Sequence, residues 1–459
     1  MYTRYEEYLI ERAEWQSFFK SSTLLIIAFA TVFFPRLLDS AGAPSPINFL
    51  HFAVVPGTCA FVLLQTRTRG RDQIVTVQVL LFALVCLLCV ELASALLNNA
   101  GVVNIALDYL LLTEPIIFIV AIACLPLSQT SVDQFRGWFV GFNLFNIVAA
   151  LFQRFALNLH RRPGLGDNIQ GVFYRSGSGH VVGASVALSF ALYFFVTAKQ
   201  RPLWQRSAIL AASLVHLVFA DAKQLIVVSV LGFIILTLLK VGDLKKLVLY
   251  SILAVIICWV GYWAIYQFEV LRAFRTWIRP ELYGPDGEAT HLKFSSIRIM
   301  LSHYRSGLEW FIGLGPGHTT DRLGGWMLKD YGNLLMPLGA TTTNIGSETW
   351  AATGDSWLGD KSSFFSPFWG WAAIWGDLGF LGLGAYISLW AIIWQRLCKD
   401  DLSRFLLITA MLHGLIFTQM EEPGYMVTIT AVIGLRWQEL RSTAKKQQHR
   451  SGSRETLGH

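Results

Sequence analysis

The sequence predicts an all-α integral membrane protein with about twelve transmembrane helices and one large folded loop between the ninth and tenth spans. Hydrophobic residues make up 54% of the 459 residues and charged residues only 15%, against about 25% in soluble globular domains. Apolar runs close to the ~20 residues that a helix needs to cross a bilayer recur along the chain. Because no long polar linker interrupts them, we expect a single polytopic membrane domain over residues 1–459.

Each predicted span is a mostly apolar run bounded by polar or charged residues. A charged stretch precedes the first run and no small-residue cleavage site follows it, so we expect a retained span and not a cleaved signal peptide. A tight turn at Asp221-Ala222 is all that separates the seventh and eighth runs. The spans are expected near residues 21–38, 47–65, 74–97, 105–126, 137–157, 181–198, 204–220, 224–240, 246–267, 368–395, 402–419 and 424–437.

The distribution of lysine and arginine predicts the orientation of these spans. With the N-terminus inside, every predicted inner loop carries at least one of the 37 lysine and arginine residues, whereas the short outer loops 98–104 and 420–423 carry none. This asymmetry follows the positive-inside rule, so we expect both termini in the cytoplasm. The net charge of +7 then belongs to the cytoplasmic loops and does not indicate a nucleic-acid partner.

Two outer segments carry most of the remaining cations. One is the segment between the fifth and sixth spans, which Arg154, Arg161, Arg162 and Arg175 flank or occupy, and the other is the large extracytoplasmic loop at about 268–366. Long loops escape the positive-inside rule, so these cations do not contradict the orientation. They concentrate positive charge where an anionic ligand could be held.

The large loop is rich in Trp, Phe, Leu and Ile, so we expect it to fold over the membrane domain. Apolar residues recur at three- and four-residue spacing across 294–312, which predicts one amphipathic helix. Arg298 and Arg305 would share its polar face, which is either a binding surface or an ordinary solvated face. His318 follows the glycine-rich end of this helix and is either a general base or a surface histidine.

Several ionisable residues fall within the predicted spans, where such groups are costly and mark functional sites unless they form structural pairs. Lys223 lies beside the Asp221-Ala222 turn at the expected outer surface, where a lysine either grips a phosphate or snorkels. The ionisable residues within the spans are Glu91, Asp108, Glu114, Arg154, His216, Asp377 and His413.

Three local stretches, together with the layout of the spans, carry a resemblance to a known family. They are Gly171–His180 before the sixth span, Asp221-Ala222-Lys223-Gln224 before the eighth, and Gly313-Leu314-Gly315 combined with Gly376-Asp377-Leu378-Gly379-Phe380-Leu381-Gly382. In these stretches the chain resembles the O-antigen polymerase and O-antigen ligase superfamily of bacterial membrane glycosyltransferases. It departs from the family at Lys223, where arginine is frequent, and at Ser363–Phe368, where ligases often carry a His-Asn pair.

The resemblance implies a polyprenyl-diphosphate-dependent glycosyltransferase of the bacterial plasma membrane. Its substrate would be an undecaprenyl-diphosphate-linked oligosaccharide, whose repeat units are polymerised on the outer face into a surface polysaccharide such as an exopolysaccharide or capsule. We assign Arg175 and Lys223 to binding of the diphosphate, and His318, Arg298 and Arg305 to catalysis.

No cofactor and no metal are expected, because no Asp-x-Asp motif occurs on the outer side. The implied partners are the lipid-linked oligosaccharide and membrane lipid, with a chain-length regulator and a flippase beside them and no nucleic acid.

Three alternatives stay open from the sequence. The chain resembles ligases as well, which would transfer the polymer to a lipid A core. A polysaccharide or lipid flippase would share the many spans, but such transporters often show internal repeats, and none is visible here. A membrane scaffold without chemistry is the third alternative.

Overall fold

The computed structural model describes residues 20–65, 70–125, 129–163, 165–174, 178–241, 244–268, 275, 279–359 and 363–455. Over these residues the chain forms helices and no β-strand, which confirms the all-α prediction. The described part contains seven helices that are long and apolar enough to cross a membrane by length and composition, and three shorter apolar helices. The number of crossings, predicted at about twelve, stays a prediction.

Each predicted span overlaps at least one helix, because an apolar backbone segment can satisfy its hydrogen bonds internally only by helix formation. The first predicted span, 21–38, covers two short helices, and the fifth begins later than its helix. The eleventh runs past the end of its helix at His413, and the last lies within a much longer helix. The helices are α2 (Ser21–Phe33), α3 (Pro35–Ser40), α4 (Leu50–Gln65), α5 (Arg71–Asn98), α6 (Val102–Cys124), α7 (Gln129–Phe155), α8 (Gly179–Thr197), α9 (Leu203–Phe219), α10 (Lys223–Leu239), α11 (Leu244–Gln267), α19 (Gly370–Arg396), α20 (Asp401–His413) and α21 (Pro423–Glu455).

The centre of the bundle is formed by α6 and α21, which pack against each other and against α2, α4 and α8. Ile116 and Ile119 of α6 and Met426 and Ile433 of α21 are fully buried. Phenylalanine rings from α6 and α7 pack against Phe29 of α2 in tilted and edge-on arrangements in the same core. The outer helices instead expose large apolar side chains, as lipid-facing surfaces do; examples are Phe82, Phe233 and Trp259.

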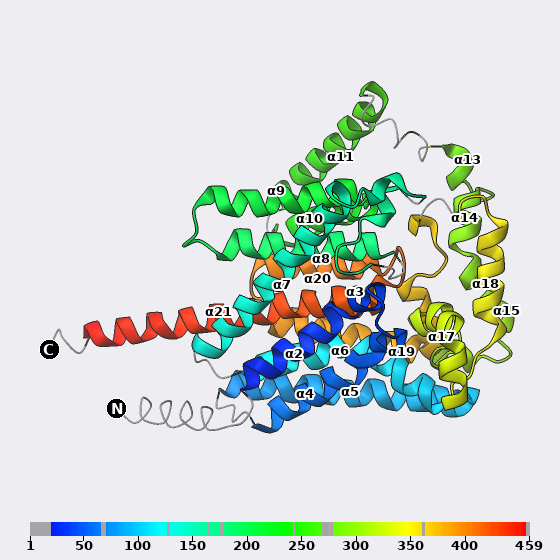
Figure 1. Ribbon diagram of the computed structural model, residues 1–459, viewed down its shortest axis with the longest axis horizontal. Helices are drawn as coiled ribbons and strands as arrows, with labels where there is room; N and C mark the ends of the chain where they lie inside the picture. Colours follow the sequence, from blue (N-terminus) through cyan, green and yellow to red (C-terminus); the bar gives the residue numbers. More distant parts are fainter. Residues whose placement is uncertain are drawn as a thin grey trace.

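The long segment between α11 and α19 gathers at one end of the bundle, opposite the end at which α2 begins and α21 ends (Figure 1). We call this the loop end. Leu323, Met327 and Leu335 of the segment pack against Phe52 of α4 and Leu111 of α6. The segment is built from α13 (Pro280–Tyr283), α14 (Glu288–Lys293), α15 (Ser295–His303), α16 (Glu309–Ile312), the π-helical turn η5 (Leu323–Met327), α17 (Leu328–Leu335) and α18 (Asn344–Asp355).

The prediction of one helix across 294–312 is wrong. The chain leaves α15 at Tyr304, whose φ of −68° and ψ of 124° are extended, and starts again at α16. The Glu309 carboxylate accepts hydrogen bonds from the backbone N–H groups of Arg305 and Ser306. This side chain satisfies amides that a continuous helix would have paired internally, so the break is stable.

The glycine-rich turn after α16 lies against a break in α19. The N–H groups of Leu314 and Gly315 donate to the carbonyls of Gly376 and Asp377, at 2.8 and 3.0 Å. Gly379 has a φ of 63° and a ψ of −166°, a conformation that is essentially restricted to glycine. The two glycine motifs that carried part of the resemblance therefore form one contact, in which their backbones meet closely.

Candidate active site

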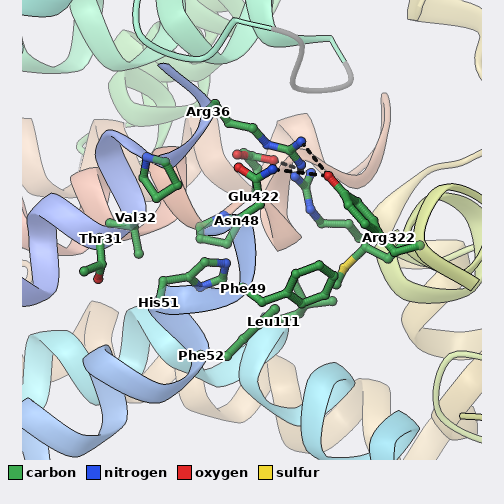
Figure 2. Close-up of a pocket in the computed structure, with 14 residues that line it drawn as sticks. Thr31, Val32, Arg36, Asn48, Phe49, His51, Phe52, Leu111, Arg322 and Glu422 are labelled. Atoms are coloured by element: carbon green, nitrogen blue, oxygen red, sulfur yellow. Dashed lines mark hydrogen bonds and ion pairs between the residues drawn. The ribbon is translucent and has the colours of Figure 1, made fainter. Parts of the chain in front are cut away.

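A polar cleft opens at the loop end between α3, α4, α17 and the start of α21 (Figure 2). Its apolar wall consists of Phe49, Phe52 and Leu111. Its polar wall brings together side chains from three distant parts of the chain, namely Arg36, Asn48, His51, Arg322, Tyr331 and Glu422.

Two arginines contribute positive charge to the cleft. Arg36 donates from Nη1 to the hydroxyl of Tyr331 at 3.3 Å, and Asn48 donates to the same hydroxyl at 3.2 Å. Arg322 forms an ion pair with Glu422, and these side chains are only 14% and 6% exposed. Burial lowers the pKa of Arg322, Glu422 opposes this shift, and the positive charge of Arg36 adds to it. A guanidinium stays ionised under such a shift, so two neighbouring positive charges face one side of the cleft.

The fold of a tight turn places Arg322 in the cleft. Asp321 accepts hydrogen bonds from the N–H groups of Leu323 and Gly324, at 3.1 and 2.6 Å. The N–H of Arg322 donates to the Glu421 carboxylate at 2.5 Å. These bonds fix the backbone on both sides of Arg322, so its side chain extends away from Asp321 toward Glu422.

A histidine held by a carboxylate completes the polar wall. His51 lies in the first turn of α4, and its Nδ1 is 2.9 Å from both carboxylate oxygens of Glu114 in α6. The two side chains are 9% and 0% exposed. In the neutral tautomer that donates its Nδ1 proton to Glu114, Nε2 is the lone-pair nitrogen. Among the described residues no protein group hydrogen-bonds to Nε2, and the ring lines the cleft (Figure 2).

This arrangement is chemically that of a general base. A carboxylate that accepts the Nδ1 proton fixes the tautomer and the orientation of the ring, and it stabilises the imidazolium that forms when Nε2 takes a proton. Two guanidiniums nearby stabilise an anion that develops in the same reaction. The cleft can thus deprotonate a hydroxyl and neutralise an anionic leaving group.

His318, the base expected from the sequence, is buried beside the glycine-rich turn. Its Nδ1 lies 2.9 Å from the carbonyl of Leu314, and its Nε2 lies 2.8 Å from the hydroxyl of Thr341. Burial lowers its pKa, so the ring is neutral near pH 7 and donates to Leu314. Both ring nitrogens have protein partners, and a catalytic role for His318 stays a hypothesis.

The lysine expected at the diphosphate and the two arginines expected in catalysis lie apart, each with its own local surroundings. Lys223 starts α10 and pairs with Asp221 at 2.8 Å in the predicted turn. Arg298 is exposed on α15 and donates to the carbonyl of His291. Arg305 is exposed in the turn before α16 and not on the same helical face as Arg298. Arg175 lies outside the described residues.

Sequence reasoning missed the residues of the cleft for an identifiable reason. His51 and Arg36 are single polar residues at span ends, a position at which polar residues are ordinary. Glu114 was noted as an ionisable residue within a span, but its partner is 63 positions away along the chain. The one indication of the site in the sequence was the rule that an ionisable residue within a span needs a partner.

The sequence matches no known family model. No curated protein shows significant similarity to it either.

Proposed function

We propose that the chain is a glycosyltransferase that polymerises oligosaccharide repeat units carried on a polyprenyl diphosphate, by transfer to a sugar hydroxyl at the loop end. The observation that carries the proposal is the cleft, which combines two guanidinium groups with a histidine oriented by a buried carboxylate. The resemblance of the layout to O-antigen polymerases supports the choice of substrate. On this proposal the loop end faces the outside of a bacterial plasma membrane, and both termini lie in the cytoplasm.

The proposed step is a substitution at the anomeric carbon of the donor sugar. The acceptor hydroxyl oxygen forms a bond to this carbon, and the bond from the carbon to the diphosphate oxygen breaks with its electron pair leaving on the diphosphate. The hydroxyl proton passes to Nε2 of His51, and Glu114 stabilises the resulting imidazolium. Arg36 and Arg322 form charge-assisted hydrogen bonds to the leaving diphosphate.

A polymerase must hold two lipid diphosphates, because donor and acceptor are both lipid-linked repeat units. A ligase needs only one lipid diphosphate, on its donor. We therefore assign the donor diphosphate to the cleft, and the acceptor diphosphate to the cations expected from the sequence. These are Arg175, Lys223, Arg298 and Arg305.

The test compares variants of the histidine pair in a strain that lacks the native copy. His51→Ala and Glu114→Gln are expected to lower the transfer rate by about 10²–10⁴-fold, the usual contribution of a general base. The measurements are the chain length of the surface polysaccharide and the amount of the protein in the membrane. Loss of polymer with single repeat units still exported favours polymerase over ligase and flippase.

The chain offers a matched control outside the cleft. His303 of α15 pairs with Glu348 of α18 at 3.0 Å, and both side chains are partly exposed. His303→Ala is expected to leave polymer length unchanged. Full-length polymer from the His51→Ala variant at normal membrane levels would contradict the proposed base.

The arginine arm of the test uses Arg36, because its partner is a neutral hydroxyl and its removal leaves no buried charge unpaired. Arg36→Ala is expected to lower the transfer rate by about 10²–10³-fold, and Arg36→Lys to restore part of it. Arg201→Ala, at an exposed turn between α8 and α9, is the control that removes positive charge elsewhere. Polymer of the same chain length from all three variants would contradict binding of the diphosphate in the cleft.

A further inference from the structure

A group of buried carboxylates lies beneath the loop end, separate from the His51–Glu114 pair. Asp108 of α6, Asp321 of the turn before η5 and Asp377 of α19 each present a carboxylate oxygen, and these oxygens lie within 4.8 Å of one another. The three residues are at most 2% exposed. They come from elements 56 to 269 positions apart in the chain, so only the tertiary structure assembles them.

The hydrogen bonds around two of these carboxylates favour their ionised forms. Asp377 accepts from the N–H of Thr319 at 2.8 Å and from the N–H of Gly317 at 3.2 Å. Asp321 accepts from the N–H groups of Leu323 and Gly324. A carboxylate that accepts two backbone donors is stabilised as an anion, so the backbone around the group supports negative charge at both positions.

Further buried oxygens around the group have no hydrogen-bond partner in the described part of the chain. Both carboxylate oxygens of Glu91 are unpaired although the residue is fully buried, and so are Oδ2 of Asp108 and Oε1 of Glu421. Glu91 interacts electrostatically with both Asp108 and Asp321. A fully buried carboxylate near other carboxylates is costly without a counter-charge.

The described residues supply no such counter-charge from the protein. No described lysine or arginine forms an ion pair with Asp108, Asp321 or Asp377, and the nearby Arg322 turns away to pair with Glu422. A buried group of anions needs either bound protons or a bound cation to be stable.

We propose that Asp108, Asp321 and Asp377 bind one divalent cation, with Ca²⁺ the preferred ion, and that Glu91 borders this site. Hard oxygen ligands suit Ca²⁺ and Mg²⁺. The limit of 4.8 Å between the ligand oxygens is about twice a Ca²⁺–oxygen distance of ~2.4 Å, and the irregular group suits the flexible geometry of Ca²⁺ better than the strict octahedron of Mg²⁺. The unpaired oxygens of Glu91 and Glu421 are available as additional ligands.

The cation would fasten the long segment to the bundle. Asp321 belongs to the segment, whereas Asp108 and Asp377 belong to α6 and α19. A shared ion therefore joins three elements at the turn that also positions Arg322. The inference is independent of the proposed transferase activity, because binding and its structural effect are measurable without substrate.

The test uses the full chain in nanodiscs, first depleted with a chelator and then titrated with CaCl₂ by calorimetry. One Ca²⁺ per chain is expected, together with slower amide exchange at Gly317 and Thr319. Asp108→Asn is expected to weaken binding by about 100-fold, and Glu91→Gln by about ten-fold. Glu348→Gln removes a partly exposed carboxylate of α18 and is expected to bind as the unaltered chain does.

Elemental analysis of protein purified without chelator provides the second measurement. A divalent ion at one per chain, lost in Asp108→Asn, supports the site, and Mg²⁺ with the same dependence would correct only the preferred ion. If the unaltered chain contains no bound metal and shows no calcium-dependent heat, the proposal is overturned. The carboxylates would then be neutralised by shared protons. Equal affinity in Glu91→Gln and Asp108→Asn variants and in the unaltered chain would place the ion elsewhere and overturn it too.

Discussion

At the residue scale, two pairs of consecutive residues direct their side chains into different environments. Asp321 faces the buried carboxylates and Arg322 faces the cleft, and Glu421 and Glu422 repeat this division. Burial, followed by the charge of Asp321, raises the pKa of Glu421 well above its usual range. Burial also raises the pKa of Asp321 to about 6. The acidic group is therefore an unfavourable environment for more negative charge, whereas the cleft next to it is suited to an anion.

Lys223 allows a test of the acceptor site at this scale. Its side chain is 34% exposed and its pairing with Asp221 is a surface contact, which contributes little to stability. Lys223→Ala is expected to raise KM for the lipid-linked acceptor by about 10- to 100-fold, the value of one hydrogen bond to a charged group, with the protein still in the membrane. Lys223→Arg retains the charge and is expected to retain activity. Lys199→Ala, an exposed lysine beyond α8, is the control, and an unchanged KM in Lys223→Ala would remove this residue from the acceptor site.

At the element scale, the break in α19 determines how the long segment meets the bundle. The backbone at Gly379 turns out of the helix, and the freed carbonyls of Gly376 and Asp377 accept N–H groups from the turn after α16. Ser94 of α5 donates to the same Asp377 carbonyl at 2.8 Å. Three elements thus share the backbone groups that a continuous helix would have paired internally.

Substitution of Gly379 tests this contact. An alanine Cβ at this position would clash with the backbone of Phe311, and the φ of 63° is strained for any residue with a side chain. Gly379→Ala is expected to lower the free energy of unfolding by about 1–3 kcal/mol, measured as a lower Tm in detergent. Gly384→Ala is the matched control on α19, because its Cβ would meet no atom within 4 Å. A Tm loss of the same size in both variants would contradict the importance of the close contact.

The turn between α19 and α20 gives a pH-dependent test at the same scale. Burial alone would raise the pKa of Asp400, but hydrogen bonds from Ser403 and Arg436 outweigh it and lower the pKa below its usual value. The carboxylate caps α20 through the N–H of Ser403 at 3.0 Å and pairs with Arg436 at 2.8 Å. Because the pKa is lowered on folding, the stabilisation is present above about pH 4 and is lost as the pH falls through the folded-state value.

Asp400→Asn separates the charge from the cap, since asparagine also caps helices well. The variant is expected to unfold at a lower Tm than the unaltered chain at neutral pH. Its free energy of unfolding is expected to fall by roughly 1 kcal/mol or less, because the pair is partly exposed to solvent. The two melting curves are expected to converge as the pH is lowered below about 4. A constant difference across the acid range would exclude the carboxylate as its source, and Asp133→Asn at an exposed pair with Arg136 is the control.

At the scale of the whole molecule, the bundle has two unlike ends. The long segment covers one end, and α2 begins and α21 ends at the other (Figure 1). The sequence-based orientation assigns the covered end to the outside, and this assignment has a direct test. In a cysteine-free background, Ser347→Cys in intact cells is expected to react with a membrane-impermeant thiol reagent, whereas Ser442→Cys is expected to react only after the membrane is opened. The reverse labelling pattern would contradict the predicted orientation of the protein in the membrane.

The sequence by itself determined the class of the fold and the approximate places of the long apolar helices. Apolar runs such as 74–97 and 105–126 coincide with α5 and α6, because a backbone surrounded by lipid must pair its own N–H and C=O groups within the segment. The tight Asp221-Ala222 turn was predictable for the same reason, since two apolar runs leave only these residues to reverse the chain. Asp221 adopts a φ of 52° there.

Only the tertiary structure decided which residues form a site. His51 and Glu114, or Asp108, Asp321 and Asp377, meet because of helix packing, which brings together positions far apart in the chain. The break at Tyr304 likewise depends on where the Glu309 carboxylate points, which helical periodicity does not contain. Periodicity and hydropathy report the environment of each segment separately, whereas a cleft or an ion site is a property of several segments held at fixed distances.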